Sequence, residues 1–158
     1  MNAPQLENKK GFTIIEVVLV LAIAALIFLM VFIALPALQR NQRDTARKNQ
    51  MSKVLAAVTS YQSNNRGKNP TLNDSFAKYL DGDYEAAGSL IRLGTDYTVQ
   101  IDTPTSGNVP TGASNDNIAL VFGFKCDVDG EVVTGGSNRQ AAVVMRLENG
   151  DAFYCQEG

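Results

Sequence analysis

The 158-residue sequence predicts an α+β fold, in which a long N-terminal α-helix packs on a C-terminal antiparallel β-sheet. Three observations predict it. An apolar run covers residues 12–38, helix-spaced apolar residues continue to about residue 65, and the last third alternates short apolar segments with turn signals. The expected organisation is a short segment 1–11, an apolar half-helix 12–38, an amphipathic half-helix 39–65 and a globular head 66–158.

The apolar run is 27 residues long and carries one charge, Glu16. As a helix it spans about 40 Å, more than the ~30 Å hydrocarbon core of a membrane requires. A cleavable secretory signal is the first alternative, but its apolar region is about 7–15 residues long, and Leu35-Pro36-Ala37 is a poor cleavage site. An ordinary membrane anchor is the second alternative, and it leaves Glu16 unexplained because a carboxylate in a membrane helix costs several kcal/mol.

The helix is expected from Phe12 to about Asn65, where Gly67 and Pro70 end it. Pro36 is expected to kink or locally unwind it. An apolar stripe should place its second half on the sheet; the stripe consists of Met51, Val54, Leu55, Val58 and Tyr61. Basic residues fall in the preceding turns, which we expect to be the more solvent-exposed ones: Arg40, Arg43, Arg47 and Lys48.

Charge is unevenly distributed along the chain. Five bases and one acid lie in the basic segment Arg40–Lys53, whereas thirteen acids and five bases follow from Asp74 onward. The basic segment could contact anionic lipid headgroups or nucleic acid. A solvated helix face, or a complement to an acidic neighbour, is the favoured interpretation.

The head should begin with a connecting region. Asn73 or Asp74 could cap a short helix through Leu80, and 84–93 could hold another. Strands are then expected at 97–101 (the first), 118–126 (buried), 131–133, 141–147 and 152–155. Asp129-Gly130 and Asn149-Gly150 are hairpin turn signals, and 103–117 is expected to be an exposed loop.

Two cysteines, Cys126 and Cys155, are best interpreted as one disulfide in an oxidising compartment, because two thiols without a histidine make a poor zinc site. The bond would constrain the unfolded chain by roughly 3–4 kcal/mol. This prediction conflicts with the positive-inside rule, since five bases follow the apolar run and only Lys9 and Lys10 precede it. Composition alone does not resolve the conflict.

No catalytic constellation is evident. The sequence has no histidine, no nucleophile motif and no phosphate-binding glycine loop. Asp127-x-Asp129-Gly130-Glu131 resembles a fragment of a calcium loop but lacks the remaining ligand spacing, so a plain hairpin turn is favoured. The prediction is a protein that is not an enzyme, with no cofactor and no assigned metal site.

The N-terminus resembles the type IV pilins and their pseudopilin relatives. The resemblance lies in Lys9-Lys10-Gly11 followed by Phe12-Thr13-Ile14-Ile15-Glu16 and an unbroken apolar helix. It implies a leader, residues 1–11, that a membrane-embedded prepilin peptidase removes after Gly11, with methylation of the new N-terminal Phe12. It also implies a cytoplasmic leader and an outward-facing head, which favours the cysteines over the charge rule. The layout of the head is similar to a pilin head in element order alone.

The resemblance also explains Glu16, which lies at i,i+4 from Phe12. In family filaments the corresponding carboxylate neutralises the N-terminal amine of a neighbouring subunit. An unpaired charge in a dry fibre core would cost several kcal/mol, so pairing would fix the axial register. The alternative is an edge carboxylate that pairs with Lys9 or Lys10. Two features depart from the family pattern: its usual glycine is missing from the apolar run, and Pro36 lies about three residues further from the glutamate than is usual.

The function implied is a structural subunit of a type IV pilus, held in the inner membrane before assembly into an extracellular fibre for adhesion, motility or DNA uptake. The partners implied are membrane lipid, the prepilin peptidase, an assembly platform with its ATPase, and copies of the same chain. A minor pilin or a pseudopilin of a secretion or competence machine is the second hypothesis. A DNA-binding adhesin that uses the basic segment is the third, and nucleic acid is disfavoured because the acidic head would repel phosphate.

Overall fold

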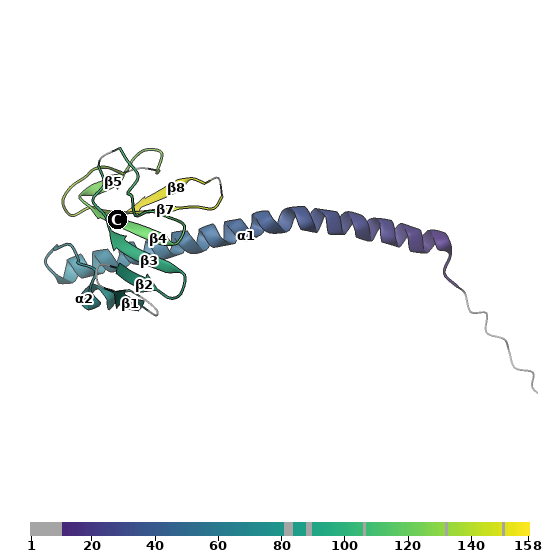
Figure 1. Ribbon diagram of the computed structural model, residues 1–158, viewed down its shortest axis with the longest axis horizontal. Coiled ribbons are helices and arrows are strands. Elements are labelled where there is room, and N and C mark those ends of the chain that lie inside the picture. Colours follow the sequence, from purple (N-terminus) through teal and green to yellow (C-terminus); the bar gives the residue numbers. More distant parts are fainter. Residues whose placement is uncertain (1–10, 81–83, 88–89, 106, 132, 150) are drawn as a thin grey trace, which may run out of the picture. The chain divides into compact units, whose positions relative to one another are not determined.

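The structure is a computed structural model that describes residues 11–80, 84–87, 90–105, 107–131, 133–149 and 151–158 (Figure 1). The chain divides after Gln39 into two compact units, the apolar N-terminal unit and the head, residues 40–158. One helix, α1 (Ile14–Asn64), contributes to both units. The single long helix that the sequence predicts is therefore confirmed, with its ends one to two residues inside the expected ones.

In the N-terminal unit, α1 is helical without interruption through Pro36. Of the two expected effects of Pro36, local unwinding is wrong, and a kink stays a prediction. Proline removes one backbone donor, so the carbonyl four residues earlier loses its helical partner. Helix propagation on both sides outweighs this single loss, because each further residue adds a hydrogen bond once the helix is nucleated.

The head contains a six-stranded sheet in the order β1-β2-β3-β4-β7-β8 (Figure 1). Its strands are β1 (Tyr84–Ala87), β2 (Leu90–Leu93), β3 (Tyr97–Ile101), β4 (Asn117–Phe122), β7 (Ala141–Arg146) and β8 (Phe153–Glu157). All neighbouring pairs are antiparallel except β3 and β4, which are parallel with Val99 opposite Ile118. The predicted α+β fold is confirmed, and its sheet is antiparallel in four of five pairings.

The second half of α1 packs on one face of this sheet. Met51 and Val54 are fully buried, and Leu55 and Val58 nearly so, which confirms the predicted stripe. They share one core with inward residues of four strands: Ile91, Val99, Ile118, Leu120, Val143 and Met145. Tyr61 closes the end of the stripe with edge-on contacts to Phe76 and Tyr79, at centroid distances of 5.9 and 5.4 Å. Aromatic pairs favour this edge-to-face geometry.

A small second sheet covers part of the opposite face. It pairs β5 (Phe124–Cys126) with β6 (Val133–Gly135) over a second core of Val121, Val133, Ala142, Val144 and Cys155. A disulfide joins Cys126 of β5 to Cys155 of β8. The predicted disulfide is present, and it fastens the β5–β6 hairpin to the main sheet.

Two strand predictions are wrong. Residues 84–93 contain β1 and β2 instead of a helix, and β3 is consequently the third strand instead of the first. Alanine and leucine are good helix formers, but intrinsic propensity is a weak determinant that tertiary pairing overrides. In β2 the burial alternates, with Ile91 and Leu93 turned to the core.

The expected single strand 118–126 is also divided. Gly123 adopts a φ of 78°, a conformation that glycine reaches without steric cost, and the chain leaves β4 for the second sheet there. The apolar run 118–126 therefore contributes one strand to each of the two sheets.

The short helix is confirmed but shorter than expected. Asn73 is the N-cap of α2 (Asp74–Ala77), and its side chain accepts hydrogen bonds from the backbone N–H groups of Ser75 and Phe76. The helix ends at Ala77, before the expected Leu80.

Both predicted hairpins are confirmed as antiparallel pairs, β5 with β6 and β7 with β8. The strand expected at 131–133 is displaced, because β6 begins at Val133 and Glu131 lies in a bend. Gly150 of the second turn lies outside the described residues. The loop 102–116 crosses from β3 to β4 and is mostly exposed or half-buried, but Pro110 within it is buried.

Candidate functional site

The predicted processing segment is open to solvent where the structure describes it. Phe12 is 89% exposed, and no atom lies within 4 Å of the position that a Cβ would take on Gly11. Lys9 and Lys10, the alternative partners of Glu16, lie outside the described residues. The Gly11–Phe12 bond is therefore locally open to approach by a peptidase.

Thr13 and Glu16 form a reciprocal cap at the start of α1. The Glu16 Oε2 atom accepts hydrogen bonds from the Thr13 backbone N–H at 3.1 Å and from the Thr13 hydroxyl at 2.9 Å. The Thr13 carbonyl in turn accepts from the Glu16 N–H at 3.1 Å. This is one half of a capping box, in which the side chain at the third helical position satisfies the N-cap amide. The other half is replaced, because the Thr13 hydroxyl donates to the Glu16 carboxylate instead of accepting the Glu16 N–H. Sequence reasoning missed Thr13, and the spacing Thr-x-x-Glu was the signal that could have found it.

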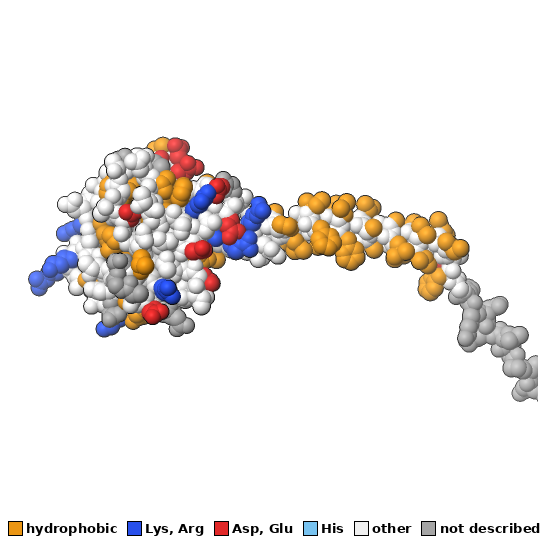
Figure 2. Space-filling model, viewed as in Figure 1, with side chains coloured by type: hydrophobic (Ala, Val, Ile, Leu, Met, Phe, Trp, Pro, Cys, Tyr) orange, Lys and Arg blue, Asp and Glu red, His pale blue; other side chains and the backbone are white. Residues whose placement is uncertain are grey.

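The residues after this cap form an exposed apolar surface along the helix, one face of which is visible in Figure 2. Large side chains from Phe12 to Leu38 are exposed, including Leu26 at 66% and Phe32 at 72%. The most apolar window of α1 has a mean hydropathy of 3.3, and α1 is long and apolar enough to cross a membrane. Apolar surface of this extent requires a cover of lipid or of protein.

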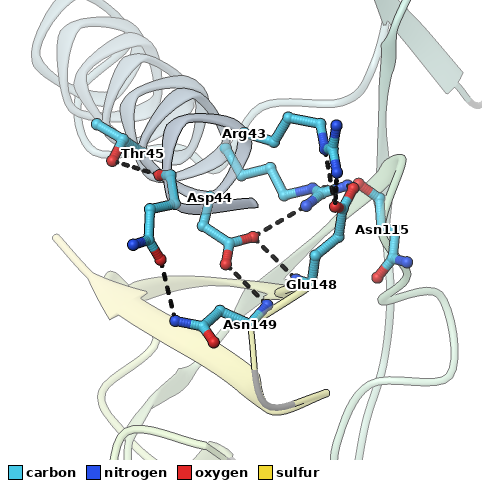
Figure 3. Close-up of polar contacts among 8 residues, drawn as sticks. Arg43, Asp44, Thr45, Asn115, Glu148 and Asn149 are labelled. Carbon is cyan, nitrogen blue, oxygen red and sulfur yellow. Dashed lines mark hydrogen bonds and ion pairs between the residues drawn. The ribbon is translucent and has the colours of Figure 1, made fainter. Parts of the chain in front are cut away.

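A second polar site lies in the head, at the turns of α1 shortly before Met51 (Figure 3). Arg47 donates to Asp44 Oδ1 at 2.9 Å, to Glu148 Oε1 at 2.7 Å and to the Asn115 carbonyl at 2.9 Å. Asp44 also accepts the backbone N–H groups of Glu148 and Asn149, at 2.8 and 2.9 Å. This charged cluster joins α1 to the β3–β4 loop and to the turn after β7.

The expectation that Arg47 lies in a solvent-exposed turn is wrong. Its side chain is only 5% exposed, and that of Asp44 is 9% exposed. Burial is possible because every charged group in the cluster finds an opposite charge or a backbone partner. The acidic neighbour of the basic segment, an alternative at the sequence level, is thus Glu148 of the same chain.

Electrostatics keep this cluster ionised. Burial by itself raises the pKa of Asp44, but the two backbone N–H groups and Arg47 more than offset it, so the pKa lies below its usual value. Hydrogen bonds from Arg43 and Arg47 lower the pKa of Glu148. Burial lowers the pKa of Arg47, and its two carboxylate partners more than reverse this.

Two further cations of the basic segment have partners within the head. Arg43 contacts Glu148 Oε2 through Nε and Nη2, each at 2.7 Å. The Lys48 ammonium lies 4.4 Å from the centroid of the Tyr154 ring. Three of the five bases of the segment are therefore engaged, which weakens the hypothesis that the segment binds phosphate.

The Asp127–Glu131 segment forms a tight turn. Asp127 Oδ1 accepts the Glu131 N–H at 3.0 Å, and Gly130 has a φ of 70°. Among the described residues, no three histidine, cysteine or acidic side chains are placed to hold a metal ion.

Comparison with known proteins identifies the N-terminus. Residues 7–32 match the prokaryotic N-terminal methylation motif. No curated protein and no solved structure matches the chain. The matched region contains the capped start of α1 and most of its apolar surface.

Proposed function

We propose that this chain is the structural subunit of a type IV pilus. The premise is that it is a member of the type IV pilin and pseudopilin family, which its N-terminal methylation motif supports. The motif and the apolar helix fit a membrane-anchored prepilin. The observation that carries the proposal is the exposed apolar surface that follows directly on the motif. The same helix can first be covered by lipid and later by helices of other subunits.

Processing comes first in this proposal. Prepilin peptidase cleaves after Gly11 and Phe12 becomes the methylated N-terminus. The exposure of Phe12 and the open surroundings of Gly11 support access to this bond.

Glu16 has two successive roles in the proposal. In the precursor its carboxylate caps α1 through Thr13. In the fibre it neutralises the Phe12 amine of a neighbouring subunit. Among the described residues, both hydrogen bonds of the cap go to Oε2, which leaves Oε1 as an acceptor for a second donor. Pairing of the two charges removes the cost of an isolated charge in a water-poor fibre core.

Location follows from the same sequence of events. The leader stays in the cytoplasm, α1 crosses the inner membrane and the head faces outward, where the Cys126–Cys155 disulfide is stable. An assembly platform and its ATPase then transfer the subunit into the extracellular fibre.

Mass spectrometry of the N-terminal peptide tests the proposal. Material sheared from cells is compared with the membrane fraction, and a methylated Phe12 terminus abundant in the sheared material is expected. A Phe12 terminus confined to membranes would instead identify a minor pilin or a pseudopilin. An intact Met1 in cells that possess the peptidase would refute the processing step.

A further inference from the structure

Two exposed patches of opposite charge lie in the head, outside the charged cluster. The basic corner consists of Arg66, Lys68 and Arg139, and the acidic turn consists of residues 127–131 with Asp129 and Glu131 exposed. Figure 2 shows basic side chains at the end of the head where α1 ends, and acidic side chains over the β5–β6 end. Within the described part of the chain, the three cations of the basic corner form no ion pair.

The basic corner is built by contacts between distant segments. The Arg139 guanidinium lies about 3.1 Å from the position of a Cβ on Gly67, and thus lies directly over the turn that carries Arg66 and Lys68. Gln62 Nε2 donates to the Arg139 carbonyl at 3.1 Å, and Asn69 Nδ2 donates to the Asn138 carbonyl at 3.1 Å. These bonds hold the β6–β7 loop against the end of α1.

The acidic turn is also firmly held. The Cys155 N–H donates to the Gly130 carbonyl at 2.7 Å, and the Cys126–Cys155 disulfide anchors its first strand. Val128 at its tip is fully exposed. The turn therefore presents Asp129 and Glu131 beside an apolar tip on a rigid support.

The register of the β5–β6 hairpin places the two patches at its opposite ends. Cys126 pairs with Val133 next to the acidic turn, whereas Phe124 pairs with Gly135 next to the loop that carries Arg139. Strands rise about 3.3 Å per residue, so the hairpin separates the patches. Because the two patches lie at opposite ends of the hairpin, a contact between them requires a second copy of the chain.

We propose that the acidic turn of one subunit docks on the basic corner of the next. A contact between two different patches is heterologous, and a repeated heterologous contact that does not close into a ring generates an open helical fibre. This inference rests on the proposed function, because the contact would align the heads of subunits whose apolar helices already associate. The opposite net charge of the patches identifies a second copy as the occupant.

Charge reversal on each side tests the contact in the full-length chain in its host. Lys68→Glu with Arg139→Glu reverses the basic corner, and Asp129→Lys with Glu131→Lys reverses the acidic turn. Each pair of substitutions should lower the yield of sheared filaments about tenfold. One exposed ion pair contributes a factor of roughly two to five to the association equilibrium constant, and charge reversal adds repulsion between the subunits. The four substitutions together should restore the yield.

Two controls keep the outcome interpretable. Glu85→Lys with Asp96→Lys reverses two exposed acids elsewhere in the head, and should not rescue the basic-corner reversal. The amount of each variant in the membrane with an intact Cys126–Cys155 disulfide reports whether it folds. Where the basic-corner reversal lowers this amount, the milder variant Lys68→Gln with Arg139→Gln is used instead. It should lower the filament yield less than the charge reversal does.

Several results would overturn the inference. One is a wild-type filament yield from both reversals. Another is a lowered filament yield from both reversals that the combined variant does not restore. The last is a lowered filament yield from the basic-corner reversal alone. The last result would assign the basic corner to another polyanion, such as nucleic acid. Absence of filaments from the unaltered chain would refute the proposed function itself.

Discussion

The Arg47 guanidinium and the Asp44 carboxylate meet at 2.9 Å, less than one helical turn apart on α1, with both side chains more than nine-tenths buried. Each also bonds to a segment more than sixty residues away, Arg47 to Asn115 and Asp44 to the Glu148 amide. The pair therefore fastens the helix to two loops of the head. The turns of α1 that contain Arg43 to Arg47 are held to the head by polar contacts, and the turns from Met51 onward by the apolar core.

Arg47→Ala should destabilise the head by about 3 kcal/mol, because removal of one partner of a buried ion pair leaves the other charge uncompensated. Denaturant unfolding of the full chain in detergent would measure the change in the free energy of unfolding. Arg40→Ala, at an exposed position of the same helix, is the matched control and should change it by no more than about 0.5 kcal/mol. Equal effects of the two substitutions would show that the cluster does not hold the helix.

Stability should fall in acid. The folded-state pKa of Asp44 lies below its value in the unfolded chain, which is about 3.9. At pH values near 4 the unfolded state therefore binds more protons than the folded state, and stability rises with pH there. The contribution of Asp44 is complete above about pH 5 and is lost as the pH falls through the folded-state pKa.

The free energy of unfolding of the head, measured from pH 7 to pH 3, checks this prediction. A flat profile to about pH 5 followed by a decline is expected. Asp44→Asn should be less stable at pH 7 and should show a shallower decline. A decline as steep as that of the wild type would assign the acid sensitivity to other carboxylates, such as Asp102. Burial raises the pKa of Asp102, but hydrogen bonds from Gly112, Thr103 and Thr111 more than offset this and lower it.

Glu16→Ala and Glu16→Gln separate capping from charge. Glutamine retains an oxygen that can accept the Thr13 N–H, whereas alanine removes both the cap and the charge. Both variants should be cleaved nearly as the wild type is, and both should yield at least tenfold fewer filaments, because even one lost ion pair of about 1.4 kcal/mol is tenfold in an equilibrium constant. Filaments of Glu16→Gln at wild-type abundance would show that the carboxylate acts as a cap alone.

Cys126→Ser with Cys155→Ser should cost the head about 3–4 kcal/mol, the loop-closure term for a sequence separation of 29. The loss should appear as a lower unfolding midpoint of the full chain and as faster proteolysis of the β5–β6 hairpin. Reduction of the wild-type protein is the matched comparison. Free thiols at both positions in a non-reducing peptide map of the native protein would remove the bond and one argument for an outward-facing head.

Local features of the sequence predicted much of the fold. The helical spacing of Met51, Val54 and Val58 predicted the docked face of α1, and Asp129-Gly130 predicted a hairpin turn that the structure contains. The residues from Lys9 to Glu16 predicted the N-terminal methylation motif, which residues 7–32 match. Such features depend on residues less than about ten apart, so periodicity and turn chemistry report them.

Tertiary structure alone decided the remainder. The parallel pairing of β3 with β4 depends on a long crossover. β2 pairs with β3, and β1 in turn pairs with β2. Arg47 is buried because the Asn115 carbonyl and Glu148 contact it from loops 68 and 101 residues away, respectively.

By itself, then, the sequence determined the long helix, its apolar half, the processing motif and the disulfide pair. Only the folded head decided which strands are neighbours, which charges are buried and which charges remain exposed. The physical reason is that periodicity and turn chemistry act between near neighbours in sequence, whereas the burial of a charge or the pairing of a strand depends on groups that only folding brings together.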